Sequence, residues 1–391
     1  MNILLGFIMA NHKKSILILT PAFAPNVGGV ETHLTDLTEY LRNNNYFTFV
    51  LTYQPITSKT KGPGIERRRN LEIHRYTWFS GNYFNIFVNL HPIFNFLYLT
   101  PYLGLRTFLF LLNHRKKIDI IHCIGLSTAF SGLIFKYVFH IPVIMTTETL
   151  FNFRPHSLLA RVVKGMTSHL DTILAQSEQS KQEFVDLGVN PKKITVFSHW
   201  INQNIFKPLD KKLAKKKLGW ENKFTALFVG RLIPEKGVRL VIDAVKEIGP
   251  NINLKIIGDD STELEYVLKS SSKNINFLGK IPHNQLPAYY QAADVLIYPA
   301  LYKEDMAYVL LDALSCGTPV INTNPGSGIY KLSPSSAFVI SPKVSDIVKY
   351  TQYLMSRPEV CRSMSKSAAK FARKFGPRQA TAITNVYDQL N

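Results

Sequence analysis

The stretch "KSILILTPAFAPNVGGVETHLTDLTEYLRNNN", Lys14–Asn45, shows how this chain begins to fold. Its first part is a continuous apolar run ending in turn residues, which is typical of a strand buried on both faces of a parallel sheet. Two glycines, Gly28 and Gly29, follow, and then come apolar residues at helical spacing: Val30, Leu34, Leu37 and Leu41. A strand, a glycine turn and a helix form the first unit of a doubly wound α/β sheet.

Similar apolar runs recur along the chain in two series. Between residues 46 and 200 we predict strands in "YFTFVLTYQ", "IDIIHCIGL", "IPVIMTTET", "TILAQS" and "ITVFSHW". After a lysine-rich segment around Lys211–Lys217 we predict them in "FTALFVGRL", "NLKIIGDD", "INFLGKI", "VLIYPA", "PVINT" and "AFVISP". The fold class is therefore α/β, with two Rossmann-like doubly wound parallel-sheet domains facing across a cleft. We place the domains at residues 1–205 and 206–375, followed by a terminal helix at 376–391 that can return to the first domain.

Composition and charge narrow the class of protein. With 391 residues, 46% hydrophobic and 19% charged, the chain is globular and long enough for two domains. The net charge is +19, and residues 1–217 carry +14 of it. Such an excess suits an anionic membrane surface, phosphorylated substrates or nucleic acid, and charge alone leaves these open. The three cysteines lack metal-binding spacing, and the N-terminal apolar run lacks the preceding charges of a signal peptide, so we expect a cytoplasmic protein without bound zinc.

Residues 83–112, "YFNIFVNLHPIFNFLYLTPYLGLRTFLFLL", are nearly free of charge and rich in Phe, Tyr and Leu. We expect Pro92 and Pro101 to break this segment into pieces shorter than the ~20 residues that a bilayer crossing needs. Basic clusters, Arg67–Arg69 and His114–Lys117, flank it on both sides. Two interpretations remain open: core packing with helix dimer contacts, or a segment lying on an anionic membrane surface.

Two cations leave a predicted strand in "LFVGRLIPEKGV". Arg231 and Lys236 lie on a loop that contains Pro234 and leads into a helix. At the carboxyl end of a strand such a pair can hold a diphosphate, the arginine by its planar fork and the lysine as a point charge. An ordinary exposed loop can also carry these residues, and the motif alone does not exclude that.

Two acids frame an apolar helix in "YKEDMAYVLLDALSCGTPV", Tyr302–Val320. Glu304 precedes the helix, and Asp312 lies four residues beyond Tyr308. Backbone amides near Tyr308 and Val309, at the helix start, can bind an anion. A phosphate with a carboxylate on either side suits a nucleotide-sugar, whereas the alternative is a solvated acid and a capping acid.

Taken in order, several stretches resemble glycosyltransferase family 4 of the GT-B fold. They are "GGVETHLTDLTEYL", "ILAQSEQSKQEFVDLGVNPKKITVF", "LFVGRLIPEKGVRLVIDAV", "INFLGKIPHNQLPAYYQAADVLIYPALYKED" and "VLLDALSCGTPVI". The resemblance covers most of the chain and is strongest from about residue 172 to 326. It implies retaining transfer of a sugar from a UDP- or GDP-linked donor, with no cofactor and no bound metal.

The resemblance also assigns roles to individual residues. Arg231 and Lys236 match the cations that hold the donor diphosphate and stabilise the leaving group. Glu304 matches the acid at the donor sugar, and Asp312 matches the acid at the ribose, with Tyr308 and Val309 between them. Gly28 and Gly29 match the glycine loop that approaches phosphate and acceptor.

One histidine also matches the family's pattern, and several other residues differ from it. His122, at the end of a predicted strand, matches a position that is often functional, although a buried histidine with satisfied hydrogen bonds is the alternative. Asp312 stands where the family has glutamate, about 1.5 Å longer. Met306 and Ala307 replace part of a Gly-Phe-Gly run, and Glu148 stands where histidine is common.

From these residues we hypothesise transfer of a sugar to a lipid- or polyprenyl-linked glycan at the cytoplasmic face of the cell membrane. The expected partners are the nucleotide-sugar, that acceptor and an anionic membrane surface to which the protein binds peripherally, and not nucleic acid. Two alternatives stay open, a GT-B-type nucleotide-sugar isomerase and a non-catalytic membrane-surface binding protein. An assay of donor hydrolysis distinguishes the three.

Overall fold

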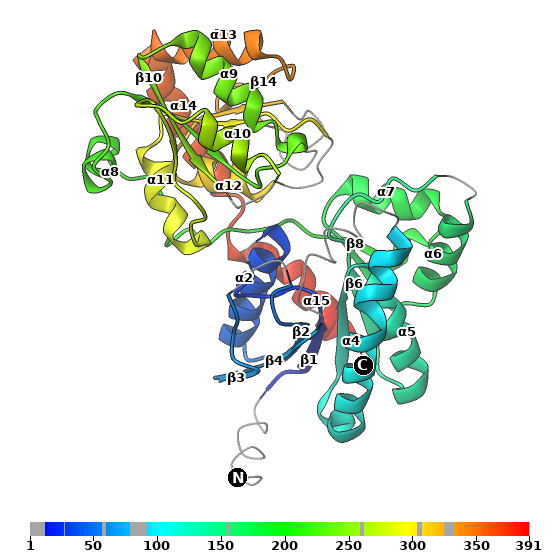
Figure 1. Cartoon of the computed structure of the whole chain (residues 1–391). Helices are drawn as coiled ribbons and strands as arrows, with labels where there is room; N and C mark the ends of the chain where they lie inside the picture. The colour runs from blue at the N-terminus through cyan, green and yellow to red at the C-terminus, as the bar shows by residue number, and fades with distance from the viewer. Residues whose placement is uncertain are drawn as a thin grey trace. The chain divides into compact units, whose positions relative to one another are not determined.

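A computed structural model describes residues 12–26, 28–56, 60–78, 92–154, 157–258, 262–302, 307–323 and 332–390. The chain forms two compact units (Figure 1). One contains the residues up to His199 together with those from Arg378 onward, and the other contains Trp200–Pro377. Each is built on its own sheet, so the predicted pair of doubly wound parallel-sheet domains is confirmed.

The first unit has an eight-stranded sheet of order β3-β4-β2-β1-β5-β6-β7-β8. All neighbouring strands are parallel except β3 and β4. Its strands are β1 (Ser15–Leu19), β2 (Phe47–Tyr53), β3 (Ile65–Arg68), β4 (Leu71–Tyr76), β5 (Ile120–Ile124), β6 (Val143–Thr146), β7 (Thr172–Ala175) and β8 (Ile194–Val196). Its helices are α2 (Gly29–Asn43), α4 (Pro92–His114), η2 (Arg115–Lys117), α5 (Leu126–Phe139), α6 (Leu158–Ser168), α7 (Glu178–Asp186), η3 (Pro191–Lys193) and α15 (Thr381–Gln389).

Side chains on alternate sides of these strands pack against different helices. Leu17 and Leu19 belong to a core shared with apolar residues of α4, α5, α6 and α7. His122 lies between two residues of that core, so its side chain points to the other face of the sheet. There it meets α15, drawn red in Figure 1 beside the blue elements of this unit. Residues from Arg378 onward therefore complete the core of the first unit.

Strands β3 and β4 correct an expectation. Arg67 and Arg68 were assigned to a basic flank of a membrane-contacting segment, but they belong to the antiparallel edge strand β3. Arg67 pairs with Glu72 at 3.1 Å, and Arg68 pairs with Glu66. Both cations are therefore paired with acids of the same sheet, although Glu66 also pairs with Arg75.

Helix α4 corrects a second expectation. Pro92 opens the helix instead of breaking it, and Pro101 lies inside a helix that continues to His114. Proline is tolerated at a first helical position, and Pro101 is exposed, so the backbone carbonyl that loses its N–H partner can be hydrated. Within the part of the chain that the structure describes, no helix is long and apolar enough to cross a bilayer. Residues 83–91 of the predicted segment lie outside the described residues.

The second unit has a six-stranded parallel sheet of order β11-β10-β9-β12-β13-β14. Its strands are β9 (Phe224–Val229), β10 (Ile252–Ile257), β11 (Ile275–Phe277), β12 (Val295–Tyr298), β13 (Val320–Asn322) and β14 (Ala337–Val339). Its helices are α8 (Lys211–Lys217), η4 (Pro234–Lys236), α9 (Val238–Ile248), α10 (Leu264–Lys269), η5 (His283–Gln285), α11 (Leu286–Ala292), α12 (Tyr308–Ser315), α13 (Val344–Met355) and α14 (Pro358–Ala372); η6 (Pro377–Ala380) then leads to α15.

Helices cover both faces of this second sheet. Leu227 and Leu296 pack in a core with α11, α12 and α14, whereas Ala226 and Phe228 pack in another with α9, α10 and α13. Strands buried on both sides read as continuous apolar runs, which is why they could be predicted. The loop at the carboxyl end of β9, where such sheets bind ligands, carries Arg231 and Lys236, and α12 carries Asp312.

Candidate functional site

The two predicted donor-side cations lie on the loop that leaves β9. Arg231 is exposed, and Lys236 is the half-buried last residue of the short turn η4. The Lys236 ammonium donates a hydrogen bond of 2.6 Å to the Tyr298 hydroxyl. It also lies 5.2 Å from the ring centroids of Tyr298 and Tyr302. The charge is thus held in place by Tyr298 at the end of β12 and by Tyr302 on the loop that follows, contacts that sequence reasoning missed.

Gly237 fixes the turn against the loop that follows β12. Its backbone has φ 71°, in the left-handed region that favours glycine, and a Cβ atom there would collide with the Pro299 carbonyl oxygen. The Leu301 amide donates to the Glu235 carbonyl at 2.7 Å. The cation-bearing turn is therefore anchored to the loop that leads toward α12.

Glycines also bring neighbouring strand ends close together. The Gly230 amide donates to the Ile257 carbonyl at 3.0 Å, and the Gly258 amide donates to the Gly279 carbonyl at 3.1 Å. A Cβ atom on Gly258 would lie 2.5 Å from the Gly230 carbonyl oxygen. Beside Arg231, the carboxyl edge of β9, β10 and β11 is thus lined by backbone, which suits close approach of a nucleotide.

The two predicted acids have different outcomes. Glu304, like Met306, lies outside the described residues. Asp312 is 1% exposed, and its Oδ2 accepts a hydrogen bond of 2.9 Å from Nε2 of His283. Its Oδ1 makes no hydrogen bond of normal geometry with any other described residue. His283 thereby fixes the carboxylate that the resemblance assigns to the ribose, a partner that sequence reasoning also missed.

Further groups surround the Asp312 carboxylate. The His283 ring packs on Phe206, with 4.7 Å between the ring centroids. Burial and the neighbouring Asp312 raise the pKa of the Tyr290 hydroxyl and of the Cys316 thiol well above their usual ranges. Both groups therefore stay neutral around this acid. Tyr308 and Val309 are the first two residues of α12, as the anion-site prediction requires.

In the first unit, the glycine loop precedes a pair of carboxyl groups. Gly28 caps α2, and Gly29 is the first residue of that helix. A Cβ atom on Gly28 would lie 2.5 Å from Oε2 of Glu31, whose Oε1 accepts a hydrogen bond of 2.9 Å from Asn26. Oε1 of Glu148 is inaccessible to solvent, and burial together with the charge of Glu31 raises the pKa of Glu148 well above its usual range. Glu148 follows β6 and Glu31 follows the glycine loop, so both lie at the end of the sheet where ligands bind.

Histidines near this loop are neutral. Nδ1 of His199 lies 3.1 Å from Nδ1 of His33, and Nε2 of His199 bonds to Oε1 of Gln176 at 2.8 Å. Burial lowers the pKa of His33 to about 3 and that of His199 well below its usual range. Both imidazoles can therefore donate and accept hydrogen bonds without carrying charge at neutral pH.

His122 has the environment of a core residue. It is 0% exposed, with Nδ1 2.6 Å from the Tyr387 hydroxyl and Nε2 2.5 Å from Oγ1 of Thr146. Burial, reinforced by His33, lowers its pKa to about 3. This geometry favours the buried histidine with satisfied hydrogen bonds, and the catalytic role stays a prediction.

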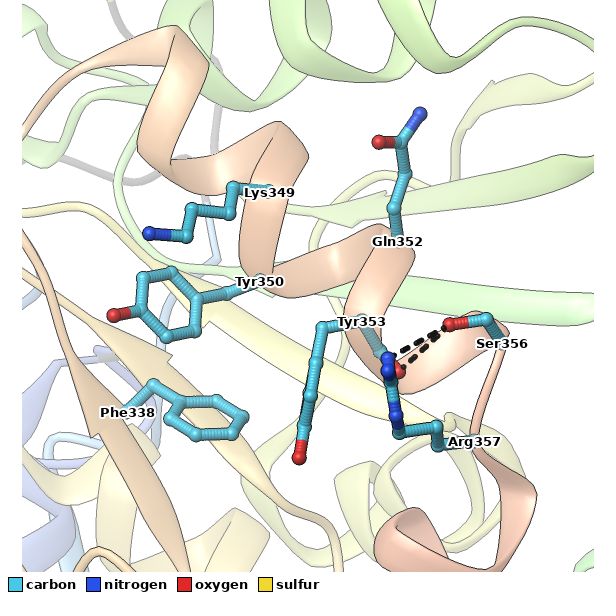
Figure 2. Close-up of a pocket in the computed structure, with 7 residues that line it drawn as sticks. All are labelled: Phe338, Lys349, Tyr350, Gln352, Tyr353, Ser356 and Arg357. Atoms are coloured by element: carbon cyan, nitrogen blue, oxygen red, sulfur yellow. Dashed lines mark hydrogen bonds between the residues drawn. The ribbon is translucent and has the colours of Figure 1, made fainter.

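A separate hollow of about 500 Å³ lies on β14 and α13 (Figure 2). Its rings are Phe338, Tyr350 and Tyr353, and Arg357 stacks 4.4 Å from the Tyr353 centroid. None of the predicted site residues lines it. In the described part of the chain, no group of three or more His, Cys, Asp or Glu residues is placed to hold a metal ion.

Comparison with known proteins identifies the family. The profile of "Glycosyltransferase Family 4" matches residues 27–204, and that of "Glycosyl transferases group 1" matches residues 210–371. The chain is 22% identical over 376 residues to the phosphatidylinositol N-acetylglucosaminyltransferase GPI3 subunit of Saccharomyces cerevisiae, covering 91% of this chain and 78% of that one. It is 25% identical over 288 residues to a D-inositol 3-phosphate glycosyltransferase of Kribbella flavida, covering 66% and 68%.

Solved structures have the same fold. Sucrose-phosphate synthase from Thermosynechococcus elongatus superposes with a TM-score of 0.77 at 20% identity, covering 97% of this chain and 99% of that one. HepE of Anabaena, solved in complex with UDP, superposes with a TM-score of 0.75 at 18% identity, covering 96% and 100%. The family favours a glycosyltransferase over the isomerase and binding-protein alternatives. The chain belongs to the GT-B glycosyltransferases of family 4 and is a glycosyltransferase.

Proposed function

We propose that the protein transfers a sugar from a UDP- or GDP-sugar to a lipid- or polyprenyl-linked acceptor at the cytoplasmic face of the membrane. The transfer retains the anomeric configuration and uses no metal. The observation that carries this proposal is the cation turn, in which Lys236 is held at the end of a parallel strand by Tyr298 and Tyr302. Arg231 lies on the same loop.

The chemistry follows from what leaves the donor. When the bond between the anomeric carbon and the diphosphate breaks, negative charge develops on the diphosphate. An ammonium fixed by a 2.6 Å bond needs little reorganisation to stabilise that charge, and an arginine fork can bind two phosphate oxygens. Positive side chains thus supply what a metal ion supplies in other transferases. Asp312, fixed by His283, binds the ribose, and Glu304 binds the donor sugar.

The acceptor part of the proposal draws on the relatives. One of them is named for transfer to phosphatidylinositol and another for transfer to an inositol phosphate. Both acceptors are phosphorylated, and the first is a membrane lipid. The glycine loop at Gly28 and the carboxyl groups of Glu31 and Glu148 lie in the first unit, which the resemblance assigns to the acceptor.

Release of the nucleoside diphosphate from a panel of UDP- and GDP-sugars tests the proposal. Arg231→Ala should lower kcat by about 10²–10³, as loss of a transition-state donor does. The matched control is Arg239→Ala, because that arginine is exposed on the next helix and pairs with Glu263 outside the proposed site. EDTA should leave the rate unchanged. A strict requirement for a divalent ion, or normal turnover by Arg231→Ala, would contradict the mechanism, and an inverted anomer in the product would contradict retention.

A further inference from the structure

An apolar surface covers three helices of the first unit. In the described part of the chain, twelve large apolar side chains on α4, α5 and α6 are between 44% and 78% exposed. On α4 they follow helical spacing along one stripe: Phe94, Leu97, Leu105, Leu109 and Leu112. The neighbouring Phe96 is half-buried and Tyr98 is buried. The exposed stripe is therefore aliphatic over most of its length.

The apolar surface continues across α5 and α6, which the sequence did not single out. Phe130, Ile134 and Tyr137 are 44%, 49% and 58% exposed on α5. Leu158 and Leu159 are 78% and 55% exposed at the start of α6. A monomeric soluble protein seldom exposes a continuous apolar patch larger than a few hundred Å².

Contacts between the helices make this one surface. Helices α4 and α5 approach closely, since a Cβ atom on Gly104 would lie 2.9 Å from Oγ of Ser131. The Phe96 and Phe130 rings meet edge to face at 5.4 Å between centroids. On the other side of α5, Lys136 donates to the His169 carbonyl, just beyond α6, at 2.9 Å. Figure 1 shows α4, α5 and α6 side by side along one flank of the first unit.

The charge of this face has one sign. Together α4, η2, α5 and α6 contain seven Lys or Arg residues and no Asp or Glu. Five of the seven are exposed: Arg106, Lys116, Lys117, Arg161 and Lys164. Lys136 is neutralised by Asp171 at 2.7 Å. A surface with aliphatic side chains and an excess of positive charge complements a bilayer that contains anionic lipid.

We propose that this three-helix face docks on an anionic bilayer. This docking proposal rests on the proposed function in one respect, which is that the acceptor is a membrane lipid. A second copy of the chain is a poorer occupant, since self-association through this face would bring like charges together. The face lies on the bilayer surface, with lysine and arginine side chains reaching the lipid head groups while the leucines enter the acyl boundary.

Vesicle sedimentation of the full chain tests the docking. The probes are phosphatidylcholine vesicles with and without about 30% phosphatidylglycerol, at low and high salt, an order-of-magnitude choice for a surface potential of physiological size. Leu158→Ser with Leu159→Ser, and separately Leu105→Ser with Leu109→Ser, should each weaken partitioning about 25-fold, about fivefold per side chain. Lys116→Glu with Lys117→Glu should weaken binding to anionic vesicles by at least about 25-fold.

The matched control is Leu268→Ser, because Leu268 is 53% exposed on α10 in the second unit. This variant should bind vesicles normally. Thermal denaturation verifies that every variant is folded, and each should release nucleoside diphosphate from a soluble donor at the wild-type rate.

Three results would overturn the docking proposal. They are absence of binding to anionic vesicles at low salt, binding that all three double variants leave unchanged, and a dimer that light scattering shows to dissociate in those variants. Vesicle binding by a protein that consumes no donor would refute the proposed function and leave the docking intact.

Discussion

The Tyr298 hydroxyl should influence catalysis through Lys236. Tyr298→Phe keeps the buried ring, which is 2% exposed, and removes the oxygen that accepts the 2.6 Å hydrogen bond. Because Lys236 is half-buried and water can replace the lost acceptor, we expect a cost of about 1 kcal/mol, or about fivefold in kcat/KM. Lys236→Ala removes the charge itself and should cost about 3–4 kcal/mol, or about 10²–10³ in kcat.

A double-mutant cycle measures the dependence of one residue on the other. The doubly substituted protein should be no slower than Lys236→Ala alone, which gives a coupling energy of about 1 kcal/mol. The assay is steady-state release of nucleoside diphosphate, with Tyr289→Phe as a control, because Tyr289 packs against Trp220 away from the cation turn. Effects that simply add in the double variant would refute the argument that Tyr298 positions the ammonium.

Two further predictions concern pH and the ribose acid. Burial and the nearby His33 lower the pKa of His122 to about 3 in the folded protein, whereas it is near 6.5 in the unfolded chain. The resulting stability is present above pH 6.5 and is lost as pH falls, because the unfolded chain then binds a proton that the folded protein does not. At pH 5 the loss is about 2 kcal/mol. Denaturation at pH 7.5 and 5.0 should therefore show a fall in unfolding free energy that is smaller by about 2 kcal/mol in His122→Gln, and an equal fall in both proteins would contradict this. Because His283 holds the carboxylate, His283→Ala should weaken calorimetric binding of UDP or GDP about tenfold, and Asp312→Asn should weaken it to a similar extent. Wild-type affinity in His283→Ala would make the contact purely structural.

Most of the strands that the sequence revealed are buried on both faces, whereas β8, β11 and β14 among them are partly exposed. Continuous apolar runs located every strand of the second sheet and most of the first. Strand β3 was missed because it is an exposed edge strand rich in charge, so Arg67 and Arg68 were interpreted as a basic cluster. Strand β4 was missed because Glu72, His74 and Arg75 interrupt its apolar residues. The prolines of α4 misled for a different reason: proline breaks a helix when it removes a buried hydrogen bond, whereas exposed Pro101 leaves a carbonyl that water can reach.

In the candidate site, too, some residues could be predicted from the sequence and others could not. Arg231, Lys236 and Asp312 could be predicted because each stands at a recognisable position in a local motif. Their supporting partners come from elsewhere: Tyr298 is 62 residues from Lys236, and His283 is 29 residues from Asp312. No local spacing can reveal such contacts, since they depend on which strand ends the sheet brings together. The α5 and α6 parts of the apolar face were missed because α5 is apolar on all sides and α6 resembles an ordinary amphipathic helix, so neither sequence shows which apolar residues face outward.

The place of α15 has a consequence for how the protein is made. Tyr387 is 0% exposed and bonds to His122, and Asp388 accepts a bond of 2.6 Å from Tyr46. On the ribosome these residues emerge only after the 178 residues from Trp200 to Pro377, which take about 9–36 s at ~5–20 residues per second. Until then the first unit lacks the residues that bond to His122 and Tyr46. The second unit lies entirely within the intervening residues. The first unit therefore begins to be synthesised before the second, but its last residues are synthesised after the second unit is complete.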